Sequence, residues 1–195
     1  KTQSMVDAAY SDIGLFWDGR AERTFLDPET GEPVFKNARP LESQALESQA
    51  LGPFRSDVEM GHVGRTLDDL VTRIVASQPL ALAPSMPPAL LAFVSGRSYA
   101  QLFSEAFGSP EVTPVRVAMA IATYERTLYS DRTEIDATDS GVREPSAAAQ
   151  RGRLLFFANF CNECHRGSLV GDNRFRFVGI RPDGEDIGRA EVTKK

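Results

Sequence analysis

The stretch LLFFANFCNECHRGSLVGD, residues 154–172, decides which class of protein this sequence encodes. It holds both cysteines of the chain, Cys161 and Cys164, and one of its two histidines, His165. Side chains three positions apart on a helical turn point the same way, so both thiols face one side. Cys-x-x-Cys-His is the attachment motif of c-type haem, in which the thiols form two thioethers and the histidine binds the iron. The motif predicts covalent haem c, with His165 as the iron ligand.

Two other interpretations use the same residues. A structural zinc site needs four ligands. The cysteines and histidines of the chain are Cys161, Cys164, His165 and His62. Two of these, Cys164 and His165, are adjacent in the sequence, which is sterically awkward for binding one ion. A thioredoxin-like dithiol stands at a helix N-terminus after a strand, whereas here a helix is expected to run into the motif. Haem is therefore favoured. Because covalent haem attachment takes place outside the cytoplasm, we expect a bacterial periplasmic protein.

Composition excludes several classes of protein. The 195 residues are 42% hydrophobic and 25% charged, which is ordinary for a globular chain. The net charge is −5 with basic and acidic residues interspersed, so no nucleic-acid partner is expected. The longest apolar run, residues 79–94, contains four prolines, and we predict no membrane span. The start, KTQSMVDAAY, lacks the features of a signal peptide, so we expect a mature chain or a piece of a longer one.

Polar residues that suit helix N-caps precede apolar repeats of helical period at several points. We expect helices after Thr66, after Ser98, and after Thr113, where Pro114 takes the first helical position. A further helix is expected to begin at Ser146 and to lead into the cysteines. These helices predict an all-α fold.

The segments between them are more irregular. Residues up to Gly64 are rich in Gly, Pro, Asp and Asn, although the tandem LESQALESQA at residues 41–50 allows one or two helical turns. The polar run at residues 130–145 is a candidate boundary between two units. No stretch alternates cleanly with period two, although the sequence allows short extended pieces near residues 175–180.

A haem iron bound by His165 needs a sixth ligand or an open position. No Met, His or Tyr follows His165 in this sequence. The upstream candidates are Met5, Met60, His62, Met86 and Met119. None of these has a distinctive setting, so we expect this chain not to complete its own haem site.

Further motifs carry a family resemblance. They are GLFWDGRAE at 14–22, LESQALGPFRSDVEMG at 46–61, AIATYERTLYSD at 120–131, RGRLLFFANFCNECH at 151–165 and DIGRAEVTKK at 186–195. In this order they resemble the bacterial di-haem cytochrome c peroxidase family, which includes the MauG-type enzymes.

The resemblance implies two cytochrome c-like haem domains, both incomplete in this chain. Residues 1–133 would be the remainder of the N-terminal, peroxidatic domain, and residues 134–195 the start of the C-terminal, electron-transfer domain. The resemblance also implies a second haem. Its attachment motif is expected upstream of Lys1, and the distal ligand of the His165 haem, Met or Tyr, downstream of Lys195.

The resemblance implies site residues as well. Glu59 matches the active-site glutamate that serves as acid and base in O–O cleavage, and a carboxylate suits that role because it can take up and return a proton. Gln49 matches the distal glutamine and Pro53 a family proline, while Gln44 fits the spacing less well. The alternative for Glu59 is a solvated loop carboxylate.

Two residues of the FWDGR motif are further candidates. Trp17 resembles a tryptophan that lies between the two haems as an electron-transfer bridge, with a core aromatic as the alternative. Arg20 suits a haem propionate because a guanidinium fork matches a carboxylate, with a surface salt bridge as the alternative.

The sequence departs from the family pattern in places. About twenty residues between Trp17 and Gln49 appear as an insertion. Asn159 stands where MauG uses a tryptophan to pass electrons to its protein substrate, which weakens a MauG interpretation. His62 matches no family ligand and is interpreted as a solvated loop histidine. The family's interdomain calcium ligands are not recognisable here, so no calcium site is predicted from this segment.

The resemblance implies an oxidoreductase that reduces hydrogen peroxide with electrons passed through the haem on Cys161, Cys164 and His165. The expected partners are a small electron donor, such as a cytochrome c or cupredoxin, and the flanking segments of the same protein. A homodimer is left open. Two alternatives stay open: a MauG-like enzyme that oxidises a partner protein, and a non-catalytic electron-transfer module in which Glu59 is incidental.

Overall fold

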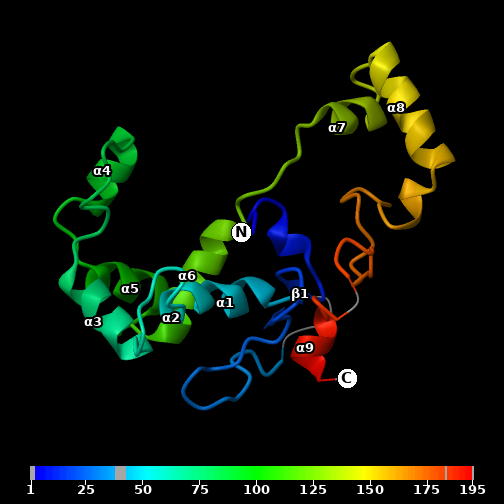
Figure 1. The fold of residues 1–195 in the computed structure, drawn as a ribbon. Helices are drawn as coiled ribbons and strands as arrows, with labels where there is room; N and C mark the ends of the chain where they lie inside the picture. Colours follow the sequence, from blue (N-terminus) through cyan, green and yellow to red (C-terminus); the bar gives the residue numbers. More distant parts are fainter. Residues whose placement is uncertain (1–2, 38–42, 183, 195) are drawn as a thin grey trace. The chain divides into compact units, whose positions relative to one another are not determined.

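The computed structural model describes residues 3–37, 43–182 and 184–194, and these residues are mainly helical (Figure 1). The α-helices are α1 Ala45–Ala50, α2 Gly52–Arg55, α3 Leu67–Ala76, α4 Pro88–Val94, α5 Tyr99–Phe107, α6 Pro114–Glu125, α7 Glu134–Asp139, α8 Ala147–Ala158 and α9 Arg189–Thr193. Two 3-10 turns accompany them, η1 Ala8–Tyr10 and η2 Cys161–Glu163. The prediction of an all-α fold is confirmed. Among the described residues, no helix is both long and apolar enough to cross a membrane.

Side-chain caps begin the helices where the sequence predicts them. The Thr66 hydroxyl accepts from the Asp69 N–H at 3.2 Å, and the Asp69 carboxylate accepts from the Thr66 N–H at 2.9 Å. Ser98 and Gln101 form the same reciprocal box at the start of α5. The Ser146 hydroxyl accepts from the third residue of α8, at 3.1 Å. Each cap satisfies backbone donors that the first helical turn leaves unpaired.

Four helices of the described residues, α2, α4, α7 and α9, go beyond those that the sequence predicts. In the polar run at residues 130–145, α7 begins at a capping box in which Thr133 accepts from the Asp136 N–H at 3.2 Å and Asp136 accepts in return. The signal is present as Thr-x-x-Asp, but the turn-forming residues around it obscure it. Helix α4 begins at Pro88, a residue whose fixed φ suits the first helical position.

The strands that form lie outside residues 175–180. Strands β1 Gly14–Leu15 and β2 Ala21–Glu22 pair antiparallel, with Gly14 opposite Glu22 and Leu15 opposite Ala21. Within the described ranges, no strand is formed at residues 175–180, where the sequence merely allows short extended pieces. Strands of two residues are too short to show period-two alternation. Their pairing depends on the turn between them, where Phe16 and Gly19 both have positive φ, 70° and 69°.

The chain forms two compact units that are not consecutive in sequence. The central unit contains residues 24–38 and 46–123, and the haem-motif unit contains residues 1–23, 39–45 and 124–195. The predicted boundary at residue 133 concerns the family's two domains and stays a prediction.

The core of the central unit lies around α6. One cluster of buried residues is Phe25, Ala50, Leu51 and Ala118, and a second is Leu70, Phe103, Val112 and Val117. Ala118 and Ala122 on α6 are fully inaccessible to solvent. Small side chains at these points allow the neighbouring segments to approach α6 closely.

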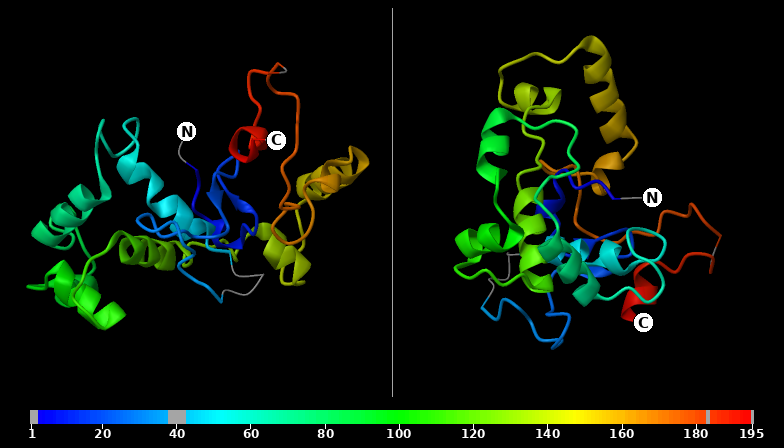
Figure 2. Two further views of the ribbon diagram at one scale, coloured as in Figure 1. Left: turned by 90° about the horizontal axis from the view of Figure 1, so that it is seen from below. Right: turned by 90° about the vertical axis from the view of Figure 1, so that its left-hand side faces the viewer.

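In the haem-motif unit, the β1–β2 hairpin and α9 lie side by side although they are distant in sequence (Figures 1 and 2). The segment after α6 also returns to the N-terminal residues. The Asp7 N–H donates to the Leu128 carbonyl at 2.9 Å, and the Ser130 N–H donates to the Asp7 carboxylate at 2.9 Å. These bonds fix the N-terminal loop within its unit.

Candidate haem site

The Cys-x-x-Cys-His motif forms a tight turn directly after α8. Phe160 takes a left-handed conformation with φ 59°, which ends the helical path and starts η2. The N–H groups of Cys164 and His165 both donate to the Cys161 carbonyl, at 3.3 and 2.9 Å. In a 3-10 turn the side chains at i and i+3 eclipse each other, so the two sulfurs face one side. Cys161 is exposed, Cys164 is half-buried, and neither forms a disulfide within the described residues. The turn fits two thioether bonds to one porphyrin edge.

The tautomer of His165 also fits an iron ligand. Its Nδ1 lies 3.0 Å from the main-chain oxygen of Val170. A carbonyl oxygen can only accept, so Nδ1 carries the proton and Nε2 keeps its lone pair. A hydrogen bond of this kind orients the ring and raises the basicity of the ligating nitrogen. The ring of Phe156 packs near the imidazole, with centroids 6.2 Å apart.

Apolar side chains are exposed in the segment that leads into the motif. Helix α8 buries none of its residues in this chain, and Leu154, Leu155 and Phe157 are all at least half exposed. Phe160, at the start of the turn, is 73% exposed. Exposed apolar clusters of this kind mark a surface that another body covers. The two faces of a porphyrin are apolar, so this surface fits a bound haem.

An ion pair orders the loop after the motif. Arg176 donates to the Asp172 carboxylate through Nε at 3.2 Å and Nη2 at 2.5 Å, and the Asp172 side chain is nearly buried. The hydrogen bond from Arg176 holds the pKa of Asp172 below its usual range. The same bond, with the charges of Asp172 and Cys164, raises the pKa of Arg176. No pattern in the sequence marks this arginine, because it is one among several in the same segment.

In the central unit, Gln49 is the candidate that the structure makes most distinctive. It lies on α1, and its Oε1 is buried without a hydrogen-bond partner among the described residues. A buried amide oxygen without a partner costs roughly 1–3 kcal/mol, so such a group is usually satisfied by water or a ligand. The position fits a residue that contacts a bound molecule.

Glu59 lies on an exposed turn after α2. The turn folds back on the helix: the Met60 N–H donates to the Pro53 carbonyl at 3.1 Å, and the Gly61 N–H donates to the Ser56 carbonyl at 2.8 Å. A Cβ atom on Gly61 would lie 2.9 Å from two main-chain oxygens, so only glycine permits this approach. Within the described ranges, no hydrogen bond joins the side chains of Glu59 and Gln49. The Pro53 contact nevertheless ties the glutamate turn to the segment that follows Gln49.

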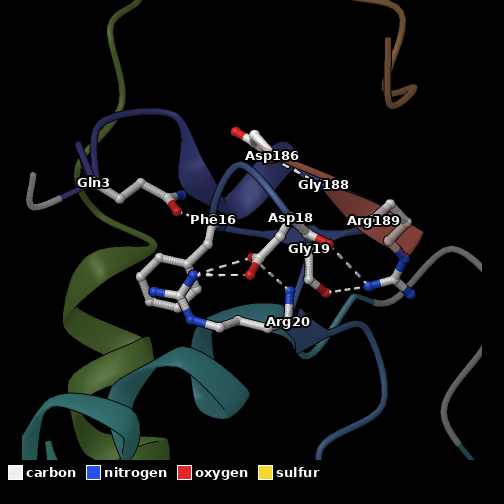
Figure 3. Close-up of polar contacts among 8 residues, drawn as sticks. All are labelled: Gln3, Phe16, Asp18, Gly19, Arg20, Asp186, Gly188 and Arg189. Atoms are coloured by element: carbon white, nitrogen blue, oxygen red, sulfur yellow. Dashed lines mark hydrogen bonds and ion pairs between the residues drawn. The ribbon is translucent and has the colours of Figure 1, made fainter. Parts of the chain in front are cut away.

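Trp17 and Arg20 both belong to the turn between β1 and β2 (Figure 3 shows its polar contacts). The Trp17 side chain is 59% exposed, so it is not a core aromatic in this chain. Arg20 pairs with the buried Asp18 carboxylate at 3.1 Å, and its guanidinium lies 3.8 Å from the centre of the Phe16 ring. The salt-bridge alternative for Arg20 is thus realised here, and its role toward a propionate stays a prediction.

The described residues offer no group of three or more His, Cys, Asp and Glu side chains placed to hold a metal ion. His62 is exposed, and its Nδ1 lies 3.0 Å from the Val63 carbonyl. The assignment of Cys161, Cys164 and His165 to a c-type haem stays a prediction.

Comparison with known proteins places the chain in a family. A family model for di-haem cytochrome c peroxidase matches residues 1–144, and the chain belongs to this family. Haem c is accordingly the cofactor that the family implies. The match ends before the Cys-x-x-Cys-His motif, so the motif supports haem independently of the family match.

Curated relatives agree with this assignment. The chain is 26% identical over 186 residues to the cytochrome c551 peroxidase of Nitrosomonas europaea, covering 93% of this chain and 42% of the relative. It is 26% identical to the cytochrome c peroxidase Ccp of Escherichia coli, covering 94% and 32%. It is 31% identical to the methylamine utilization protein MauG of Methylophilus methylotrophus, covering 97% and 44%. The chain spans less than half the length of these relatives.

Proposed function

We propose that this chain is part of a periplasmic c-type haem oxidoreductase that reduces hydrogen peroxide. One haem would be attached through Cys161 and Cys164 with His165 as its iron ligand, and a second would belong to the rest of the protein. The observation that carries the proposal is the His165–Val170 hydrogen bond, which leaves Nε2 free beside two thiols on one side of a turn. Family membership adds the peroxidase chemistry.

The reaction consumes two electrons and two protons: the O–O bond of hydrogen peroxide breaks and two water molecules form. The haems, when bound, supply the one-electron redox chemistry that this reduction needs. A small redox protein, a cytochrome c or a cupredoxin, would deliver the electrons to the His165 haem. The exposed apolar surface formed by Leu154, Leu155, Phe157 and Phe160 would bury the porphyrin together with the flanking segments of the protein.

The chain would contribute the proton transfer. Glu59 takes a proton from one peroxide oxygen and gives it to the other, which leaves as water. An exposed carboxylate at the tip of a hydrogen-bonded turn is accessible to a small substrate, and the Met60–Pro53 and Gly61–Ser56 bonds limit its movement.

Gln49 would orient the peroxide. Its buried Oε1, which is unpartnered among the described residues, can accept a hydrogen bond from a peroxide O–H. Binding there would remove the cost of the unsatisfied amide oxygen, so substrate and site are each stabilised by the contact.

Trp17 would carry electrons between the haems. A largely exposed indole beside the turn of a hairpin is available to contact a cofactor held by another part of the protein. Arg20 would reach a propionate only by leaving the Asp18 carboxylate or by sharing it, because Asp18 accepts both from the Arg20 guanidinium and from its N–H.

A MauG-like activity is the second candidate, favoured by 31% identity to a MauG protein over nearly the whole chain. Such an enzyme would use peroxide to oxidise a partner protein. Asn159 argues against this, because it is not a redox-active side chain. The distal ligand of the His165 haem separates the two functions, since the family resemblance implies Met in peroxidases and Tyr in MauG-like members.

The test is peroxide turnover by the full-length protein with a reduced donor, before and after Glu59→Gln. Loss of the acid and base is expected to lower turnover by about a hundredfold or more, with haem content unchanged. Glu32→Gln, an exposed loop residue of the same unit, serves as the control and should retain full activity. Unchanged turnover in Glu59→Gln would remove the proposed role. Reversible haem reduction without any peroxide turnover in the wild type would favour the non-catalytic module.

A further inference from the structure

Arg189, the first residue of α9, binds the turn between β1 and β2 (Figure 3). Its Nη1 donates to the main-chain oxygens of Gly19 at 2.6 Å and Asp18 at 3.3 Å. Its Nη2 donates to the Glu22 carboxylate at 2.8 Å. One guanidinium therefore contacts three residues of the first hairpin, far earlier in the chain. The Arg189 side chain is 26% exposed, so these bonds are partly shielded from water.

Two neighbours strengthen the junction. The Arg189 guanidinium lies over the ring of Phe175, 5.2 Å from its centre, and this ring also contacts Gly19. Gly188, the residue before Arg189, stands beside Trp17: a Cβ atom at position 188 would lie 3.7 Å from Cζ3 of the indole. The segment that carries Arg189 thus touches both the turn and the tryptophan on it.

Other contacts hold the turn as well. The Phe16 N–H donates to the Gln3 side chain, and the Gly19 N–H donates to the Phe16 carbonyl at 3.0 Å. Trp17 is 59% exposed and gains no fixed position from core packing in this chain. The turn also contains Phe16 with positive φ, a conformation that costs a non-glycine residue free energy unless contacts hold it. Arg20 holds the Asp18 carboxylate from one side, and Arg189 holds the main-chain oxygens of Asp18 and Gly19 from the other (Figure 3).

We propose that Arg189 is a positioning residue for Trp17: by fixing the turn at Asp18 and Gly19, it sets where the indole lies for electron transfer between the haems. This inference rests on the proposed function, because it assumes that Trp17 lies on the electron path. Arginine suits the task better than lysine, since its planar fork reaches two carbonyls and a carboxylate at once.

The test uses the full-length protein with both haems, without peroxide. One haem is reduced rapidly by a small-molecule reductant that a light flash generates. The rate of electron equilibration between the haems is then followed by absorbance. The variants are Arg189→Gln, Arg189→Lys, Trp17→Phe and the double variant Arg189→Gln/Trp17→Phe. Arg181→Gln is the matched control, because Arg181 is an exposed arginine of the same segment that pairs with Glu185 at 3.5 Å. Reduction potentials and haem spectra are measured for every variant.

The expected result is a rate several-fold lower in Arg189→Gln with unchanged potentials, because the rate of electron tunnelling falls steeply as the indole moves away from a haem. Trp17→Phe is expected to slow the rate comparably, and the double variant should be no slower than Trp17→Phe alone. Electron equilibration in Arg189→Lys should be several-fold slower than in the wild type. If Arg189→Gln loses haem, the rate of Arg189→Lys is compared with the wild-type rate in its place. Arg181→Gln should match the wild type.

The inference is overturned if Arg189→Gln transfers electrons at the wild-type rate. If Arg189→Gln loses haem, a wild-type rate in Arg189→Lys overturns it instead. The inference is also overturned if the rate reductions of Arg189→Gln and Trp17→Phe multiply in the double variant, or if Trp17→Phe keeps the wild-type rate. The proposed function fails on a different observation: a wild-type protein that exchanges electrons between its haems but does not turn over peroxide.

Discussion

The ring of Phe175 lies against Gly19 so closely that a Cβ atom at position 19 would fall well inside van der Waals contact with Cζ of the ring. The same Cβ would lie 3.0 Å from Nη1 of Arg189. Gly19 also has φ 69°, a left-handed conformation that side chains disfavour. The contact between a loop late in the chain and the first hairpin therefore requires glycine for two independent reasons.

This relationship predicts the effect of Gly19→Ala. The left-handed strain is worth about 1–2 kcal/mol and the overpacking about 1–3 kcal/mol, so the free energy of unfolding should fall by about 2–5 kcal/mol. Gly179→Ala is the matched control, because Gly179 has φ 68° and no atom lies within 4 Å of the position that its Cβ would take. Its free energy of unfolding should fall only by the cost of the left-handed strain. The measurement is urea unfolding of the full-length protein, and equal losses in the two variants would contradict the packing account.

A second prediction concerns the pH dependence of α3. Hydrogen bonds from the Thr66 backbone and side chain hold the pKa of Asp69 below its usual range. A carboxylate with a lowered pKa in the folded state stabilises the fold above its unfolded pKa, and this contribution is lost as the pH falls through the folded value. The stability difference between the wild type and Asp69→Asn should therefore be largest above about pH 4 and should shrink below it.

The capping box of α5 supplies the control for this experiment. There Gln101 takes the place of the aspartate, so the box itself contains no titrating group. Ser98→Ala should cost about 1 kcal/mol at any pH in the same range. The measurement is denaturant unfolding from about pH 3 to about pH 7, which brackets the ordinary carboxyl pKa. A difference for Asp69→Asn that stays constant across this range would show that the ionised carboxylate is not the capping group.

A third prediction concerns the turn that carries Glu59. Gly61→Ala would place a Cβ atom 2.9 Å from the carbonyls of Phe54 and Ser56, and the turn would have to move. Stability should fall by about 1–3 kcal/mol, and peroxide turnover should fall because Glu59 is displaced. Gly52→Ala, on the neighbouring helix with nothing within 4 Å, should leave turnover unchanged and stability unchanged or slightly higher. Full turnover in Gly61→Ala would mean that the position of this turn does not matter for the reaction.

Local signals in the sequence are sufficient to predict much of the fold. Thr66, Ser98 and Ser146 cap their helices as predicted, because a cap depends on residues within one turn of each other. The haem motif is equally local. The Thr-x-x-Asp box at Thr133 follows the same rule, and α7 escapes prediction only because the surrounding polar residues also suit turns.

Other features depend on contacts between distant residues and leave no local pattern. The His165 imidazole donates its Nδ1 hydrogen to the main-chain oxygen of Val170, an acceptor that any residue could provide. The buried oxygen of Gln49 reflects the packing around α1 rather than its own sequence setting. The bonds from Arg189 to Gly19 join residues that are far apart in the sequence. The family resemblance identifies the DIGRAEVTKK motif that contains Arg189, but it does not indicate which residues this arginine contacts.

The central claim is a haem held covalently by Cys161 and Cys164, and peptide mass spectrometry of the purified full-length protein tests it most directly. The account predicts that the peptide containing residues 154–172 carries the added mass of one haem, and that Cys161→Ser/Cys164→Ser abolishes the addition. A peptide with two unmodified thiols, from protein matured with haem available, would contradict it.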